Sequence, residues 1–186
     1  MRGVPDPAGA MDAANGAMLV IISGPSGVGK DTIIAKPGDR VLVIGHSMGA
    51  VIAYDALWEL THLEANPGKV DLLLTIGSPL GMHFVQDRLL GFRDPYGQRF
   101  PCNIRHWVNI AAHGDLTALD PEVRNDFLPM IEQGCAESIE DRHRGVFNYF
   151  RNDKGLNMHR SYGYLVEQHV ARAILAWWQG SADPAC

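Results

Sequence analysis

A serine nucleophile could arise from the stretch Gly45-His46-Ser47-Met48-Gly49. It follows an apolar run, residues 40–45, and precedes a segment with apolar residues at helical spacing, residues 50–60, so we expect a strand, a tight turn and a helix. In such a turn the glycines let strand and helix approach, and Ser47 Oγ stands exposed at the carboxyl end of the strand. The backbone N–H of Met48 would then donate to an oxyanion. The alternative is an ordinary strand-to-helix turn in which Ser47 caps the helix.

Serine chemistry needs a general base and a carboxylate that orients the base. In folds with this turn, the acid and then the base follow the serine along the chain. Asp115 comes directly after a predicted strand, residues 104–112, and is the favoured acid, with Asp120 as its rival. His159 stands in a predicted loop before the last helix and is the favoured base, with His143 as the alternative. The sequence therefore predicts a Ser-His-Asp triad whose members are far apart in the chain.

A second motif with chemical meaning is the glycine-rich stretch Gly24-Pro25-Ser26-Gly27-Val28-Gly29-Lys30. It fits the first seven positions of the phosphate-binding pattern G-x-x-x-x-G-K-[ST], with Asp31 in the eighth. The backbone N–H groups of such a loop cradle phosphates, and its lysine reaches them. The candidate phosphate-binding residues are Gly27, Gly29, Lys30 and Thr32.

The two motifs could share one sheet. The segment between Ser23 and Arg40 is long enough for a right-handed crossover, so the first strand could pair in parallel with the strand that ends at the serine. One backbone N–H from residues 24–29 would then lie beside Ser47 and act as a second oxyanion donor.

Strand and helix patterns alternate along the chain. Strands that are apolar on both faces and alternate with helices are typical of a parallel sheet covered on both sides. The sequence therefore predicts an α/β fold with three layers and a mostly parallel sheet. The predicted strands cover residues 18–23, 40–45, 70–76, 104–112 and 144–150, the predicted helices cover residues 50–60 and 161–178, a long loop covers residues 78–101, and helical pieces fall within residues 121–141.

Composition bounds the class of protein. The 186 residues suit one globular domain, predicted over residues 17–180 after a disordered leader over residues 1–16. Within this domain, residues 17–35 form the phosphate-loop-like segment and residues 36–180 the core. A net charge of −5 argues against a nucleic-acid or anionic-membrane partner. No apolar run approaches the roughly 20 residues of a membrane span and no signal peptide is recognised, so we expect a cytoplasmic protein.

The cysteines give no sign of a cross-linked or zinc-binding scaffold. Cys102, Cys135 and Cys186 are odd in number and share no C-x-x-C spacing. This argues against a disulfide framework and against a structural zinc site. We therefore expect no metal.

Four segments together resemble the α/β-hydrolase superfamily, in its lipase- and esterase-like branch: VLVIGHSMGAVIAYDAL, LLLTIGSPLG, WVNIAAHGDLTALD and NMHRSYGYLVEQHV. The resemblance extends from Lys36 to Trp178 and implies a truncated α/β-hydrolase-like fold, with one strand ahead of the strand that ends at the serine. It implies that Ser47 attacks an ester-type acyl carbonyl of a small-molecule substrate, that His159 carries the proton and that Asp115 orients the imidazole. It implies no cofactor.

The stretch LVIISGPSGVGKDTIIA resembles the start of guanylate kinase, over residues 18–35. This resemblance implies that Lys30 reaches the β- and γ-phosphates of a nucleotide and that a hydroxyl near Thr32 meets Mg²⁺. A P-loop nucleotide-binding protein is therefore the alternative function, and an inactive hydrolase remnant is another. An incomplete sheet with an exposed edge also favours oligomers.

Overall fold

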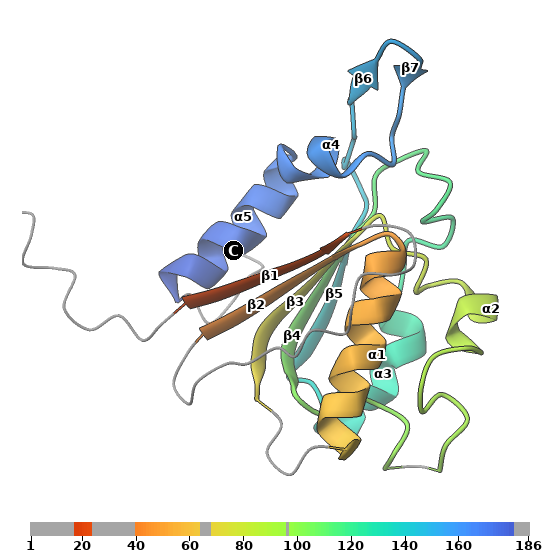
Figure 1. The fold of residues 1–186 in the computed structure, drawn as a ribbon, viewed down its shortest axis with the longest axis vertical. Helices are drawn as coiled ribbons and strands as arrows, with labels where there is room; N and C mark the ends of the chain where they lie inside the picture. The colour runs from red at the N-terminus through yellow and green to blue at the C-terminus, as the bar shows by residue number, and fades with distance from the viewer. Residues whose placement is uncertain (1–16, 24–39, 64–67, 96, 181–186) are drawn as a thin grey trace, which may run out of the picture.

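The fold is built on one parallel sheet of five strands (Figure 1). The computed structural model describes residues 17–23, 40–63, 68–95 and 97–180. Each strand pairs in parallel with the next one along the chain, in the order β1-β2-β3-β4-β5. The strands are β1 (Ala17–Ser23), β2 (Arg40–His46), β3 (Val70–Ile76), β4 (Ile104–Ile110) and β5 (Ser138–Arg142).

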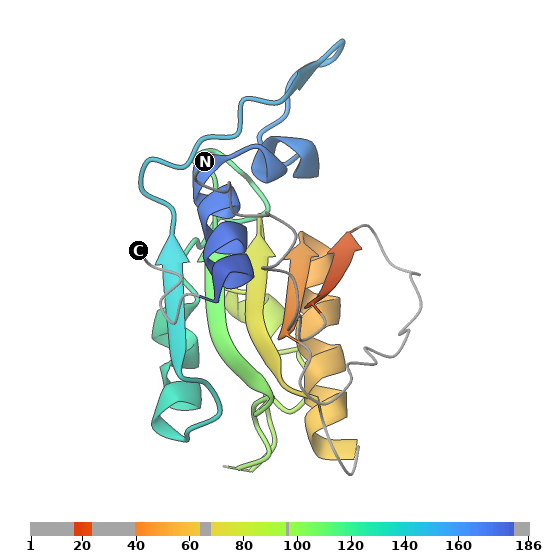
Figure 2. The same ribbon diagram turned by 90° about the vertical axis from the view of Figure 1, so that its left-hand side faces the viewer.

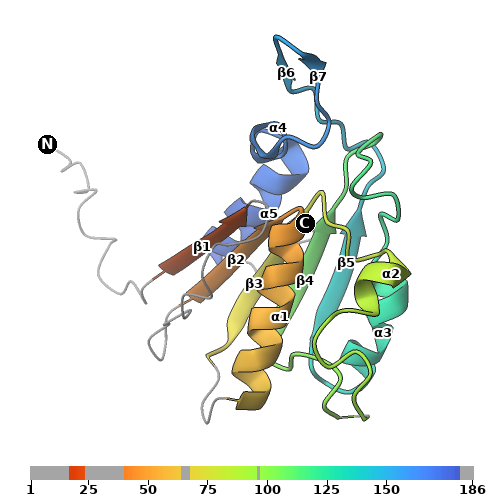
Figure 3. The same ribbon diagram turned by 45° about the vertical axis from the view of Figure 1, so that its right-hand side comes forward.

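Helices cover both faces of the sheet and make it the middle of three layers. α1 (Met48–Leu63) and α3 (Arg124–Glu132) lie on one face, and α5 (Gln168–Gln179) lies on the other (Figures 2 and 3). Val43 of β2 belongs to the core shared with α1 and α3, whereas its neighbour Leu42 belongs to the core shared with α5. Because alternate side chains of a strand point to opposite faces, both must be apolar in a covered sheet. The predicted α/β class and its three layers are confirmed.

The first four predicted strands and the first predicted helix are confirmed, with ends that shift by a few residues. The fifth predicted strand, over residues 144–150, is wrong. The fifth strand is β5, inside the segment where the sequence predicts helical pieces, and of its side chains only Ile139 is buried. The other side chains of β5 are polar or charged and half-buried, so the segment lacks the apolar run that marks the other four strands of the sheet. Residues 144–150 imitate a strand because buried Val146 and Asn148 alternate with exposed Phe147 and Tyr149.

The long helix predicted over residues 161–178 is in fact two helices, α4 (Ser161–Leu165) and α5. Glu167 between them has an extended backbone, with φ −77° and ψ 137°, and its carboxylate accepts hydrogen bonds from the N–H groups of His169 and Val170. Glutamate is outside the usual set of N-cap residues. The apolar spacing of the segment therefore hides a helix boundary that the capping carboxylate creates.

Two small elements lie in regions predicted as loops. α2 (His83–Gln86) is a single turn of helix, and β6 (Arg151–Asn152) pairs with β7 (Gly155–Leu156) as an antiparallel hairpin. The hairpin projects past the carboxyl ends of the sheet strands, at the top of the molecule in Figure 1. It therefore stands at the end of the sheet where the chemistry is expected.

A disulfide joins Cys102, just before β4, to Cys135, just before β5. This bond corrects the expectation that argued against disulfides. The two cysteines are 33 positions apart and meet because β4 and β5 are neighbours in the sheet, which the spacing of cysteines does not reveal. In the chain-entropy account a cross-link of this span adds about 3–5 kcal/mol to the free energy of unfolding.

Two predicted segments lie outside the described residues: the leader over residues 1–16 and the glycine-rich loop with its candidates Gly27, Gly29, Lys30 and Thr32. Among the helices of the described residues, none combines the length and the apolar character that a membrane span needs.

Candidate active site

The turn between β2 and α1 holds Ser47 in a left-handed backbone conformation, with φ 59°. Its N–H donates to the Ile76 carbonyl at 3.1 Å, and its own carbonyl accepts the Ala50 N–H at 3.0 Å. A Cβ on Gly45 would lie 2.6 Å from Ala50 Cα, so a glycine is needed where the strand and the helix approach. Strain of this kind at a single residue is typical of functional sites. The local sequence thus fixes the serine at the carboxyl end of β2.

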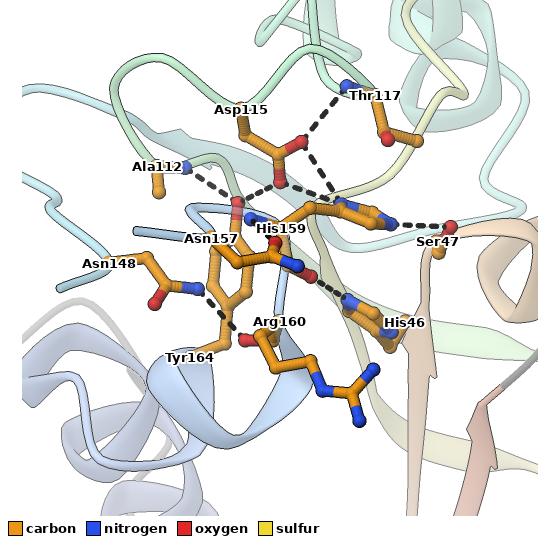
Figure 4. A network of polar contacts seen from close by, with 10 residues as sticks. All are labelled: His46, Ser47, Ala112, Asp115, Thr117, Asn148, Asn157, His159, Arg160 and Tyr164. Atoms are coloured by element: carbon orange, nitrogen blue, oxygen red, sulfur yellow. Dashed lines mark hydrogen bonds and ion pairs between the residues drawn. The ribbon is translucent and has the colours of Figure 1, made fainter. Parts of the chain in front are cut away.

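A hydrogen-bonded chain links Ser47, His159 and Asp115 (Figure 4). Ser47 Oγ lies 2.8 Å from His159 Nε2, and His159 Nδ1 lies 3.0 Å from each carboxylate oxygen of Asp115. The Asp115 side chain is fully buried, at 0% exposure, and the His159 side chain is 33% exposed. The imidazole therefore lies between a carboxylate that water does not reach and a serine at the surface of the site. The structure brings together the three residues that the sequence singles out.

The Asp115 carboxylate is held by three donors from three segments of the chain. Besides His159, it accepts the Thr117 N–H at 2.9 Å and the Tyr164 hydroxyl at 2.6 Å. Burial by itself raises the pKa of Asp115, but the hydrogen bonds from His159, Tyr164 and Thr117 outweigh burial and leave the pKa below its ordinary value. Asp115 is therefore an anion at neutral pH.

Tyr164 positions the acid and was not singled out from the sequence. Its ring is fully buried, its hydroxyl donates to Asp115 and the same oxygen accepts the Ala112 N–H at 2.9 Å. Burial, and then the hydrogen bond to Asp115, raise the pKa of Tyr164 far above its ordinary value, so the hydroxyl keeps its proton. A Cβ on Gly77 would lie 2.7 Å from the Asp115 carboxylate and 3.0 Å from the Tyr164 ring, which leaves room there for glycine alone.

The loop that carries His159 is held by polar side chains that the sequence analysis also missed. The His159 N–H donates to Asn157 Oδ1 at 3.1 Å, and the next carbonyl, of Arg160, accepts the amide of buried Asn148 at 2.8 Å. The His159 carbonyl lies 2.8 Å from His46 Nε2. Asparagine side chains inside an apolar and aromatic stretch are the one sequence signal that points to such bracing. The position of the base is thus set by contacts between distant segments.

The rival residues have other partners. Asp120 accepts the Glu122 N–H at 3.2 Å, and His143 Nε2 lies 3.8 Å from the Glu122 carboxylate. In the part of the chain that the structure describes, no hydrogen bond or ion pair joins either of them to Ser47. The geometry therefore favours Asp115 and His159 over these alternatives.

The start of α1 and the end of β1 lie next to the serine. Met48 is the first residue of α1, where backbone N–H groups have no acceptor within the helix. β1 runs parallel to β2, with Ile22 opposite Gly45 and Ser23 opposite His46, so β1 ends beside the turn as the sequence hypothesis requires. The candidate second donor, in residues 24–29, lies outside the described residues.

A cavity of about 380 Å³ adjoins His159, between the loop that carries Asp115 and the β6–β7 hairpin. A smaller one of about 210 Å³ has Asp115 in its wall. A third cavity, of about 660 Å³, lies beside β5 and includes none of Ser47, Asp115 and His159 in its wall. Within the described residues, no group of three or more His, Cys, Asp or Glu residues could hold a metal ion.

Comparison of the chain with protein-family models, with curated proteins and with solved structures finds no match. The two family resemblances in the sequence therefore stay predictions.

Proposed function

We propose that this protein is a serine hydrolase that acts on an ester-type acyl substrate. The observation that carries the proposal is the continuous hydrogen-bonded chain from Ser47 Oγ through His159 to Asp115, with distances of 2.8 and 3.0 Å. Acyl transfer through serine requires a nucleophile, a base within hydrogen-bond reach and a carboxylate that orients the base. The proposal needs no metal and no cofactor.

The positions of the protons in this chain follow from the charge of Asp115. An anionic carboxylate can only accept hydrogen bonds, so neutral His159 carries its proton on Nδ1. Nε2 is then the acceptor, and it faces Ser47 Oγ. This is the tautomer that a general base needs to take the serine proton.

In the proposed reaction, Ser47 Oγ attacks the acyl carbonyl carbon while His159 Nε2 takes the hydroxyl proton. The carbonyl electrons move to oxygen, and the Met48 N–H donates a hydrogen bond to the oxyanion that forms. When the tetrahedral intermediate collapses, the bond to the leaving group breaks and His159 gives its proton to that group. Water then attacks the acyl-enzyme with the same assistance, which releases the acid and restores Ser47.

The cavity beside His159 has the base but not Ser47 in its wall, so we infer that it receives one end of a small substrate. Its wall combines apolar side chains with amide and ammonium groups, which suits a compact acyl or alcohol group with a polar end. The residues of the wall are Gly114, Leu116, Thr117, Asn152, Lys154, Gly155, Leu156, Asn157, Met158 and His159. Because the β6–β7 hairpin supplies much of this wall, we expect changes in the hairpin to alter KM more than kcat.

The alternatives have weaker support. Nucleotide binding rests on residues 24–32, which lie outside the described residues, so no observation favours it as a second function. An inactive remnant differs from an active hydrolase in its rate and not in its class. The rate at which the wild type hydrolyses an ester therefore decides between these two.

Assembly and location belong to the proposal too. Among the described strands, β1 pairs with β2 alone, and its Leu19 and Ile21 are 52% and 55% exposed, which offers an edge for self-association.

The expected cytoplasmic location meets an opposing observation, because a disulfide such as Cys102–Cys135 is rare in reducing compartments. A count of free thiols after equilibration with reduced glutathione decides between the two: a bond that opens fits the cytoplasm, and a bond that persists fits an oxidising compartment.

The test of the function is the hydrolysis of short p-nitrophenyl esters by the wild type and by Ser47→Ala. We expect kcat to fall by at least about 10³-fold, because the nucleophile is lost. Ser138→Ala is a matched control at the first residue of β5, at the opposite end of the sheet, and should keep the wild-type rate. Equal rates for the wild type and Ser47→Ala would contradict the proposal, and an inactive wild type would support the remnant.

A further inference from the structure

His46 contacts the candidate base in two ways, although it belongs to the nucleophile's own turn. It is the last residue of β2 and is 8% exposed. Its Nε2 lies 2.8 Å from the His159 carbonyl oxygen. Because a carbonyl oxygen only accepts, Nε2 carries a proton and donates it. The residue before Ser47 therefore holds the main chain of the residue that activates Ser47.

The second contact joins the two rings. The imidazoles of His46 and His159 are stacked, with centroids 4.7 Å apart and an angle of 30° between the planes. The Tyr164 ring lies on another side of His46, with centroids 6.0 Å apart. Three contacts thus fix His159. Asp115 bonds the edge of its ring, the His46 ring stacks on the face of that ring, and His46 Nε2 bonds its carbonyl oxygen.

The charge state of His46 follows from the groups that face it. They include Asp115 after β4, His159 and Arg160 before α4, and Tyr164 in α4. Burial lowers the pKa of His46, the hydrogen bond to the His159 carbonyl raises it, and the charge of His159 lowers it again, with a result below the ordinary value. At neutral pH the His46 ring is therefore neutral. A neutral aromatic ring can lie on a cation at little cost, whereas a second cation is repelled.

We propose that His46 is a positioning residue for the general base: its Nε2–H holds the His159 backbone, and its neutral ring supports the imidazolium that His159 becomes when it takes the Ser47 proton. This inference rests on the proposed function. A consequence concerns acidic solution. Once His46 is protonated, the charge that His159 must gain forms against a second positive ring. Protonation of His46 therefore opposes the step in which His159 takes the Ser47 proton, and the pH profile of the rate carries this coupling.

Two substitutions separate the two contacts. His46→Gln keeps an N–H donor and removes the ring, whereas His46→Phe keeps a ring and removes the donor. His106→Gln is the matched control, because His106 is a half-buried histidine of β4 that bonds Ser138 and not the site. Each variant is assayed for kcat, KM and the pH dependence of kcat/KM on p-nitrophenyl acetate, and its Tm is measured.

We expect His46→Gln and His46→Phe to lower kcat by about 10- to 100-fold, as misplacement of a reacting group does, with little change in KM. We also expect the acid limb of kcat/KM to shift in both His46 variants, because the ring that faces His159 is removed or can no longer gain a proton, and to keep its wild-type position in His106→Gln. Wild-type kcat together with an unchanged acid limb would overturn the inference, as would losses of kcat that only follow losses of Tm. The Ser47→Ala variant keeps the two failures apart: if it stays active the proposed function fails, and if it is inactive while the His46 variants behave as wild type, only the role of His46 fails.

Discussion

The turn that carries Ser47 and the loop that carries His159 are built on different principles. The turn is shaped by residues close together in the sequence. Ser47 adopts a φ of 59°, and Gly45 leaves the space that Ala50 occupies. In the loop, contacts from distant segments hold His159 and its neighbours. His46 of β2 bonds the His159 carbonyl, and Asp115 after β4 bonds the His159 ring. Asn148 bonds the next carbonyl, of Arg160, and Tyr164 of α4 bonds Asp115. The nucleophile is placed locally, and the base is placed by the tertiary structure.

This difference predicts how each region tolerates change. A defect in the turn shifts β2 against α1 and so disturbs the core. A defect in the loop leaves the core intact and changes the orientation of the His159 imidazole toward Ser47. Stability and activity should therefore separate in variants of the loop and fall together in variants of the turn.

The largest effect on kcat is expected from a substitution of Asp115, the proposed acid. Asp115→Asn removes the anion that fixes the His159 tautomer, and kcat should fall by about 10⁴-fold, as it does when the carboxylate of a serine protease is neutralised. Asp120→Asn is the matched control, because Asp120 bonds only the nearby Glu122 N–H among the contacts found in the described residues. Steady-state ester hydrolysis measures both. A larger loss in Asp120→Asn than in Asp115→Asn would show that the wrong acid is assigned.

Alanine substitutions of two glycines, one in the turn and one beside the loop, compare the two regions directly. In Gly45→Ala the new Cβ meets Ala50 Cα at 2.6 Å, in the backbone of α1, and we expect about 1–3 kcal/mol of lost unfolding free energy together with lost activity. In Gly163→Ala the new Cβ would overlap the amide of buried Asn148, which must move and so releases the Arg160 carbonyl. We expect this variant to lose activity with a smaller change in Tm. Urea unfolding and ester hydrolysis test the pair, and the opposite pattern would contradict the comparison.

A smaller effect is expected when Asp115 loses the hydrogen bond from the Tyr164 hydroxyl. Tyr164→Phe leaves the Ala112 N–H without its acceptor and removes one donor from Asp115, which should cost about 1–3 kcal/mol of unfolding free energy at neutral pH.

The way in which this loss of unfolding free energy changes with pH follows from the pKa of Asp115. Because the pKa of Asp115 is lowered in the folded protein, its contribution to stability is complete above the unfolded aspartate pKa, about 3.9, and is lost as the pH falls through the folded value. Tyr164→Phe brings the folded pKa closer to the unfolded one. The stability gap between the variant and the wild type should therefore narrow in acid, as measured by urea unfolding over a pH series. A gap that widens in acid would argue against the role given to Tyr164.

The same division explains what the sequence could predict. The apolar runs gave four strands, and the glycine pattern with its flanking strand and helix gave the turn, because all of these are encoded by neighbouring residues. The candidate acid Asp115 and the candidate base His159 are predicted from their places after a strand and before a helix, and the structure brings them together with Ser47. The hydroxyl of Tyr164, the amides of Asn148 and Asn157, the ring of His46, the charged edge strand β5 and the Cys102–Cys135 bond all depend on contacts between distant segments, and no local pattern records them.

The measurement that tests the central claim most directly is covalent labelling with a fluorophosphonate, which reacts with serine hydroxyls that a neighbouring base activates. After digestion, mass spectrometry of the wild type should find the label on Ser47 at about one per chain, since a single activated nucleophile is proposed. His159→Gln, which lacks the base, should react far more slowly, and His106→Gln should react at the wild-type rate. A wild-type protein whose Ser47 stays unlabelled, or a His159→Gln variant that labels as fast as the wild type, would contradict the proposed role of Ser47 and His159.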